Sequence, residues 1–253
     1  MIRPCAVVPV YDHEHAVGAV VDSLIGAGLP TILVDDGSRA SCANVLDHLG
    51  TTRPGVQVVR RAHNGGKGAA VTDGLRAALA AGYTHALQVD ADGQHAVEDV
   101  PAFLTAASAA PHAVICGRPV FDTSMPRARF YFRYLTHVFV WLNTLSFDIR
   151  DSMCGFRIYP LAATLEMIDV EHPGARMDFD VEVLVRLHWR GVPMRWIDTR
   201  VRYPTDGVSH FRLMLDNALI SRLHALLFLG MLMRIPTLLA RRLASRRTDR
   251  HAP

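Results

Sequence analysis

The chain lacks most features that mark disulfide-stapled, zinc-finger or nucleic-acid-binding proteins. Its four cysteines are far apart and form no C-x-x-C pair, which predicts reduced, buried thiols of a cytosolic protein: Cys5, Cys42, Cys116 and Cys154. We expect no signal peptide, because Met1 to Pro4 run directly into an apolar segment. The formal net charge of +3 is too small to favour nucleic acid as a partner.

Two common glycine motifs of nucleotide-binding proteins are also missing. No G-x-G-x-x-G follows the first apolar run, which argues against a dinucleotide oxidoreductase. No G-x-x-x-x-G-K spacing is present, so a Walker loop is excluded. There is no internal repeat or low-complexity segment. At 253 residues the chain can form one large α/β domain or two small ones with a substantial core.

The C-terminal region has no long uncharged apolar run. Residues 225–233 are uncharged, and this stretch falls short of the roughly 20 residues that cross a bilayer. We expect residues 211–247 to form a pair of apolar helices broken near Arg234-Ile235-Pro236, with an arginine-rich flank suited to a membrane interface. The alternative is that these helices cover the domain core or a homodimer partner.

Apolar runs and helical patterns alternate along the first half, with a period of about 25 to 30 residues. This alternation predicts an α/β fold with a doubly wound, mostly parallel sheet flanked by helices and right-handed crossovers. The expected strands are 5–10, 31–34, 56–59, 85–90 and 113–116. Three of them end in acidic turns, at Tyr11-Asp12, Asp35-Asp36 and Asp90. A single ligand lying across the carboxyl edge of the sheet would meet all three turns.

The most informative stretch is His85 to His95, an apolar run that stops at two carboxylates one residue apart, Asp90 and Asp92. Carboxylates this close repel each other unless a cation or a shared proton intervenes. Oxygen ligands of this kind suit Mg²⁺ or Mn²⁺, ions that usually accompany a phosphate. The alternative is an acidic turn in which Asp92 or Gly93 caps the following helix. Taken alone, this motif does not decide between the two.

Four motifs in this order and spacing identify a family resemblance: Pro9-Val10-Tyr11, Val34 to Ser38, Asn64-Gly65-Gly66-Lys67-Gly68, and Asp90 to His95, followed by Gly117-Arg118 and Asp151 to Arg157. Over about residues 4–210 the chain resembles the inverting family 2 glycosyltransferases with the GT-A fold, in particular the dolichol- or polyprenyl-phosphate mannose and glucose synthases. Where that family usually has Asn-Glu-Glu, this chain has Asp12-His13-Glu14.

The resemblance implies a set of donor-side roles. Pro9, Tyr11 and Glu14 would line the base and ribose of a nucleotide-sugar, and Asp35 would accept a hydrogen bond from the base. The glycines around Gly65 would let the backbone pass close to the nucleotide, with Lys67 near it, although a turn and helix start would also explain them. Asp90, Asp92 and Gln94 would hold Mg²⁺ or Mn²⁺ against the diphosphate, with Asp92 counted among the catalytic residues. His210 would stand in a loop that closes over the diphosphate and would donate to the leaving phosphate, although a structural or exposed histidine is the alternative.

The acceptor side depends on what accepts the sugar. A phosphate monoester is already ionised near neutral pH and needs cations that position it, a task for Arg118 and for one of three further arginines, Arg127, Arg129 and Arg133. The alternative for those three is a solvated or headgroup-facing basic surface. A hydroxyl acceptor would instead need a carboxylate base, for which Asp151 is the candidate, unless Asp151 only caps a turn.

The sequence therefore predicts a hexosyltransferase that uses a UDP- or GDP-linked sugar and a polyprenyl phosphate, with anomeric inversion, as a peripheral protein on the cytoplasmic face of the cell membrane. The expected domains are a catalytic domain, 1–210, and a basic amphipathic tail, 211–253. The catalytic domain divides into a donor half, 1–117, and an acceptor half, 118–210. The alternatives are the same donor chemistry with a hydroxyl-bearing lipid, polyketide or saccharide, and, more remotely, a nucleotide-binding protein without turnover.

Overall fold

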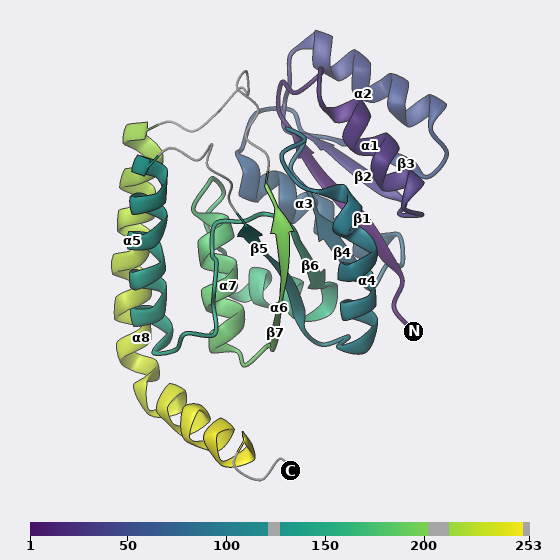
Figure 1. Ribbon diagram of the computed structural model, residues 1–253. Helices are drawn as coiled ribbons and strands as arrows, with labels where there is room; N and C mark the ends of the chain where they lie inside the picture. The colour runs from purple at the N-terminus through teal and green to yellow at the C-terminus, as the bar shows by residue number, and fades with distance from the viewer. Residues whose placement is uncertain (121–126, 202–212, 250–253) are drawn as a thin grey trace.

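The computed structural model describes residues 1–120, 127–201 and 213–249, in which seven strands form one sheet of order β3-β2-β1-β4-β6-β5-β7 (Figure 1). The strands are β1 (Pro4–Val10), β2 (Thr31–Asp35), β3 (Val56–Arg60), β4 (His85–Gln88), β5 (Val114–Val120), β6 (Arg157–Pro160) and β7 (Met194–Arg200). Neighbouring strands are parallel except for β6, which runs antiparallel to both β4 and β5. The predicted α/β class with a mostly parallel sheet is confirmed.

Helices cover both faces of the sheet, so the central strands are buried on two sides. The helices are α1 (Val17–Gly26), α2 (Ala40–Thr52), α3 (Lys67–Ala80), α4 (Val100–Ala109), α5 (Arg127–Thr144), α6 (Leu161–Glu171), α7 (Phe179–Trp189) and α8 (Leu213–Asp249), with a short 3₁₀ turn η1 (Val97–Asp99) before α4. One core joins the sheet to α1, α2 and α4, and the other joins it to α3, α6 and α7. This double burial explains why every residue of β2 and β4 is buried, rather than every second one.

The C-terminal region is one helix rather than the predicted pair. α8 contains Pro236 in its interior, and its axis changes direction toward its C-terminal end (Figure 1). Proline removes one helical hydrogen bond and bends a helix, but contacts with the body hold this bend in place. Arg234 stacks on the Trp189 ring at 4.6 Å, and Arg241 Nη1 donates to the Trp189 carbonyl at 2.6 Å. The break predicted at Arg234-Ile235-Pro236 is therefore a bend within a continuous helix.

The length of α8 corrects a second expectation. Its segment Asp216–Leu243 is 28 residues long and apolar enough to cross a membrane by length and composition. The sequence-based prediction considered only the uncharged residues 225–233. The expectation that the apolar part of the C-terminal region is too short to span a bilayer is therefore wrong. α8 packs against α5, and both lie outside α7 in Figure 1.

Candidate functional site

The carboxyl ends of β2, β1 and β4 lie side by side, as the acidic turns predict. Val10 at the end of β1 lies opposite Asp35, and Val7 lies opposite Gln88, two residues before Asp90. Because these strands are parallel, the residues that follow them open onto one edge of the sheet. That edge is where open α/β sheets bind ligands.

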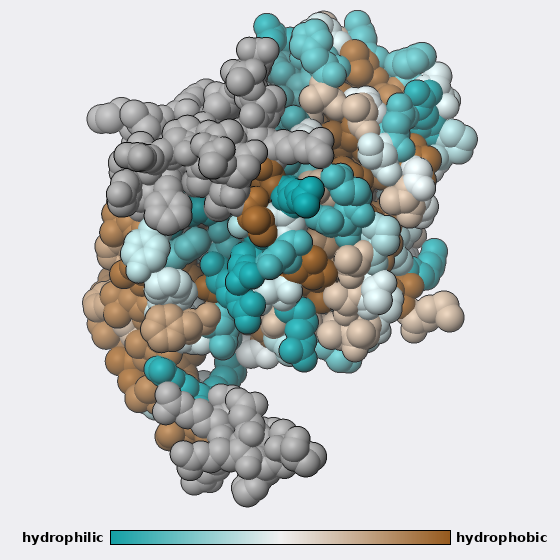
Figure 2. All heavy atoms as spheres, viewed as in Figure 1, coloured by the Kyte–Doolittle hydropathy of each residue, from teal (hydrophilic) through white to brown (hydrophobic). Residues whose placement is uncertain are grey.

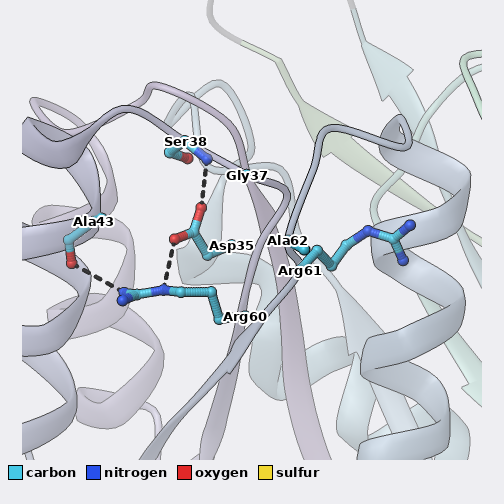
Figure 3. A pocket seen from close by; sticks show the side chains of 7 residues that line it. All are labelled: Asp35, Gly37, Ser38, Ala43, Arg60, Arg61 and Ala62. Atoms are coloured by element: carbon cyan, nitrogen blue, oxygen red, sulfur yellow. Dashed lines mark hydrogen bonds and ion pairs between the residues drawn. The ribbon is translucent and has the colours of Figure 1, made fainter.

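A pocket of about 410 Å³ opens beside Asp35, between the ends of β2 and β3 (Figure 3). Asp35 is held in place by two donors: Ser38 N lies 2.8 Å from Oδ1, and Arg60 Nε lies 3.0 Å from Oδ2. The Arg61 guanidinium points away from this pair in Figure 3. A carboxylate has about four acceptor positions, so Asp35 keeps capacity to accept from a ligand. The remaining lining residues are Gly37, Ala43 and Ala62.

Asp36 lies at this edge beside Asp35, and the sequence motifs assigned it no role. Its buried carboxylate accepts hydrogen bonds from Gly65 N at 2.9 Å and Gly66 N at 2.8 Å, and pairs with Arg61. The carboxylate therefore fixes the glycine loop that leads into α3. The sequence feature that points to Asp36 is its place beside Asp35 in an acidic turn. A sequence pattern does not show which of two adjacent carboxylates turns toward the glycine loop.

The other predicted donor-side residues surround the same edge. Pro9 lies in β1 opposite Val34, and Tyr11 follows the strand. Glu14 accepts a hydrogen bond from Ser41 Oγ at 3.1 Å, which ties the segment before α1 to α2. The structure thus brings Pro9, Tyr11 and Asp35 to one edge, and their contacts with a nucleotide stay predictions.

Asp90 is held by two neighbours. Lys67 Nζ lies 2.7 Å from Oδ1 and 3.0 Å from Oδ2, and His95 Nε2 lies 3.2 Å from Oδ2. Burial by itself would raise the pKa of Asp90, but the Lys67 ammonium and the His95 contact outweigh it and lower that pKa below its usual value. The carboxylate is therefore ionised.

His95 is a second neighbour to which the sequence motifs assigned no role. Its ring stacks on that of Phe156, with ring centroids 5.2 Å apart, and this contact joins segments far apart in the chain.

Asp92 differs from Asp90 in having little positive charge beside it. Its Oδ1 accepts a hydrogen bond from Gln94 N at 3.0 Å. Burial and then the negative charge of Asp90 raise the pKa of Asp92. A carboxylate that resists ionisation beside a charged one is the electrostatic pattern that a bound cation relieves.

The donor set therefore fits a hard divalent cation. In the ranges that the structure describes, no group of three or more His, Cys, Asp and Glu side chains gathers as a closed metal site. Mg²⁺ is commonly held by one or two carboxylates, with water and substrate phosphates filling the other positions. Asp90 and Asp92 match that kind of open site, and Gln94 as a further ligand stays a prediction.

Asp151, the predicted base, is buried and tied to α5. Arg133 donates to both of its oxygens, from Nε and Nη2 at 2.6 Å each, and His137 Nε2 lies 3.4 Å away. Burial would raise the pKa of Asp151, but His137 and Arg133 outweigh it and lower that pKa well below its usual value. A general base works best when its pKa lies near the working pH, so this carboxylate is poorly suited to the task.

The predicted acceptor arginines have separate surroundings. Arg118, at the exposed end of β5, donates to both oxygens of Asp198 on β7 at 2.6 and 2.7 Å. Arg133 faces Asp151, as described above. Arg127 and Arg129 begin α5, but their side chains lie outside the described part, as does His210. The roles proposed for these residues stay predictions.

Comparison with known proteins identifies the family of the chain. The family model described as glycosyl transferase family 2 matches residues 5–165. The chain is 28% identical over 176 residues to the undecaprenyl-phosphate mannosyltransferase of Micrococcus luteus, covering 67% of this chain and 71% of that protein. It is 28% identical over 182 residues to the polyprenol monophosphomannose synthase of Mycolicibacterium smegmatis, covering 66% and 65%.

Two solved structures share the fold at low identity. One is glucosyl-3-phosphoglycerate synthase from Mycobacterium tuberculosis with Mn²⁺, UDP-glucose and phosphoglyceric acid, at TM-score 0.66 and 14% identity, covering 91% of this chain and 79% of that one. The other is a mannosyltransferase from Pyrobaculum calidifontis with GDP-mannose and Mn²⁺, at TM-score 0.55 and 13% identity, covering 97% and 75%. With the family model spanning more than half of the sequence and the acidic strand ends gathered at one edge, this chain belongs to glycosyl transferase family 2.

Proposed function

We propose that the protein transfers a hexose from a UDP- or GDP-linked donor to a polyprenyl phosphate, with inversion at the anomeric carbon and with a bound Mg²⁺ or Mn²⁺. The relatives from Micrococcus luteus and Mycolicibacterium smegmatis support the acceptor class, because both names specify a polyprenol derivative. The fold neighbours support the donor class, because their complexes contain nucleotide-sugars with Mn²⁺.

In this proposal the donor lies across the carboxyl edge of the sheet. The pocket beside Asp35 has the size and polarity for a nucleobase, whose ring N–H groups would donate to that carboxylate. Asp90, Asp92 and Gln94 would hold the metal, which neutralises the charge that develops on the departing nucleoside diphosphate. Asp36 keeps the glycine loop in the conformation that borders this edge.

The observation that carries the acceptor assignment is the pairing of Asp151 with Arg133. A hydroxyl acceptor needs a base that can take its proton, whereas Asp151 is bound by a guanidinium at both oxygens. A phosphate acceptor needs no base and benefits from oriented arginines. Asp151 fixes Arg133 on the acceptor side of the sheet, so the pair is better suited to positioning an anion than to abstracting a proton.

An apolar surface formed by α5 and α8 supports a lipid substrate and attachment to the cytoplasmic face of the membrane. In Figure 2 hydrophobic side chains gather along the edge of the molecule that these two helices form. Its large exposed members are Tyr134, Leu135, Val138, Phe139, Leu142, Leu226, Phe228, Leu229, Leu232, Met233, Leu239 and Leu243. Surfaces of this extent mark interaction sites. A homodimer that covers the same helices is the alternative.

The test is to incubate the protein with UDP- and GDP-sugars, Mn²⁺ or Mg²⁺, and either polyprenyl phosphate or polyprenol. Product on the phosphate and none on the alcohol is the expected result. Transfer only to a hydroxyl compound would move the assignment to the alternative acceptor class. Donor binding with no transfer to either compound would favour a nucleotide-binding protein without turnover.

A further inference from the structure

Lys67, at the start of α3, forms ion pairs with two carboxylates. Of the 27 lysine and arginine residues, it is the only lysine. Its ammonium lies between two carboxylates, 2.7 Å from Asp90 Oδ1 and 2.8 Å from Asp180 Oδ2, and its side chain is 15% exposed. It therefore joins α3 to the acidic end of β4 and to the start of α7.

Glycines on both sides bring this ammonium into the site. A Cβ on Gly66 would lie 2.7 Å from the carbonyl oxygen of Ala175, and one on Gly68 would lie 2.5 Å from Phe179 Cβ. The first turn of α3 can therefore approach the segment before α7 only where side chains are missing. This close approach points the Lys67 side chain inward rather than toward solvent.

Gly155 covers the ammonium from the acceptor side. A Cβ at Gly155 would lie 2.8 Å from Lys67 Nζ and 3.0 Å from Asp90 Oδ2. A planar guanidinium is wider than an ammonium and does not fit in this space without moving Gly155. Asp180, the second partner of the ammonium, is also held in place. Gln88 Nε2 donates to its Oδ1 at 3.0 Å, and Arg157 Nη1 donates to its backbone carbonyl at 2.7 Å.

We propose that Lys67 is a positioning residue: its compact ammonium is the built-in counter-charge that holds Asp90 in the orientation needed beside Asp92, with Asp180 as the anchor of that ammonium. This inference rests on the proposed function for the role of Asp90 and Asp92, and it adds an electrostatic prediction. Lys67 and a divalent cation attract the same carboxylate, so the lysine weakens metal binding while it keeps the carboxylate in the geometry for turnover.

Variants of Lys67 distinguish a residue that positions Asp90 from one that only balances buried charge. Lys67→Met removes the charge at similar length, and Lys67→Arg keeps the charge with a wider group. The double variant Lys67→Met/Asp180→Asn restores the net charge of the cluster without restoring a cation on Asp90. The matched control is Arg76→Met: Arg76 lies on α3 like Lys67, and the change removes a cation from an exposed ion pair with Asp169 of α6.

Three measurements on the purified full chain are needed: binding of Mn²⁺ alone by electron paramagnetic resonance, melting temperature, and release of nucleoside diphosphate from the donor. We expect Lys67→Met to bind Mn²⁺ about tenfold more tightly, because a positive charge beside the site is gone. We expect its turnover to fall about 100-fold, because Asp90 is no longer held in place. The double variant should regain the melting temperature but not the turnover, and Lys67→Arg should be as slow as Lys67→Met.

The proposal is overturned if Lys67→Met weakens Mn²⁺ binding together with melting temperature and the double variant restores turnover, since Lys67 would then only balance buried charge. Wild-type turnover in Lys67→Met or Lys67→Arg also overturns it. If Lys67→Met does not fold, the double variant alone decides, through its Mn²⁺ affinity and turnover. A wild-type protein without transferase activity would refute the proposed function, while the Mn²⁺ and melting comparisons would still test Lys67.

Discussion

At the scale of single residues, the charged groups beside a carboxylate determine its pKa and therefore its chemical role. Asp90, Asp92 and Asp151 are all aspartates near one sheet edge, yet their pKa values move in different directions. Cations beside Asp90 and Asp151 outweigh burial, whereas Asp92 has burial and a negative neighbour raising its pKa. The three side chains are therefore suited to different tasks, and their substitutions should have different effects.

Replacing Asp151 with asparagine separates its two proposed roles. Asp151→Asn removes the charge that holds Arg133, so we expect the acceptor KM to rise about tenfold and kcat to stay within about threefold of wild type. Steady-state kinetics with a polyprenyl phosphate measure both constants. A loss of kcat by several orders of magnitude at unchanged acceptor KM would show that Asp151 acts as the base.

The same pair makes a prediction about stability and pH. The pKa of Asp151 in the folded protein lies below its ordinary value of 3.8, so the pair contributes stability above that pH and loses it as the pH falls further. Urea unfolding should give a difference of about 3 kcal/mol between wild type and Asp151→Asn near neutral pH. We expect that difference to shrink below about pH 4. A difference that is independent of pH would mean that Asp151 is not ionised in the folded protein.

At the scale of secondary-structure elements, glycine positions decide how closely the site's segments approach each other. Gly155 lies in the loop before β6, against the Lys67–Asp90 contact. Gly18, by contrast, lies in α1, and a Cβ there would meet nothing within 4 Å. These two positions form a matched pair for the same substitution.

Gly155→Ala should reduce turnover about tenfold or more, because its Cβ would lie 2.8 Å from Gln88 Nε2 and from Lys67 Nζ. Gly18→Ala should leave turnover unchanged and stabilise the helix by about 0.5–1 kcal/mol. Donor turnover and thermal unfolding of both variants test this contrast. Equal turnover in the two variants would contradict the tight contact between the loop before β6 and the Lys67–Asp90 pair.

The sequence predicted some of these elements and missed others. The buried strands were found because continuous apolar runs end in acidic turns, as at Asp35 and Asp90. No prediction covered α6 (Leu161–Glu171), whose apolar and polar residues follow β6 without a separating turn signal. The first helix begins only at Val17, because the Asp12 carboxylate accepts from Arg39 N and Nε and does not cap a helix.

The site could be predicted only as far as local motifs carry the information. Asp90 and Asp92 were found because both stand in one motif at a strand end. The contacts of Lys67 with Asp180, and of Asp151 with Arg133, join segments far apart in the chain, and no local spacing signals them. The partners of each charged group, and with them its pKa, are thus set by tertiary packing.

At the scale of the whole molecule, α5 and α8 connect the proposed acceptor side of the sheet to an apolar surface. α5 carries Arg133, which pairs with Asp151, and also the exposed Leu135 and Phe139. The described arginines of the bend in α8 contact the body: Arg241 donates to the Trp189 carbonyl, and Arg242 to the Leu145 carbonyl. The apolar side chains, more than these arginines, are therefore available to a membrane.

We expect Leu229→Glu/Met233→Glu to weaken flotation with phosphatidylglycerol-containing vesicles about tenfold or more, because two side chains exposed by 58% and 79% would place charge in the apolar surface. The control is Val170→Glu, an exposed position on α6. Activity on a short water-soluble isoprenyl phosphate should be unaffected in both. Unchanged flotation together with loss of a dimer in size-exclusion chromatography would instead assign the surface to a homodimer.

The account depends most on a divalent cation that links Asp90 and Asp92 to a sugar donor. Isothermal titration of UDP- and GDP-sugars into wild type and Asp92→Ala, with Mn²⁺ and then with excess chelator, tests this link directly. We predict that one donor binds only in the presence of Mn²⁺ and that Asp92→Ala loses this binding by about 100-fold or more. Donor binding that is equally tight with chelator and in Asp92→Ala would contradict the account.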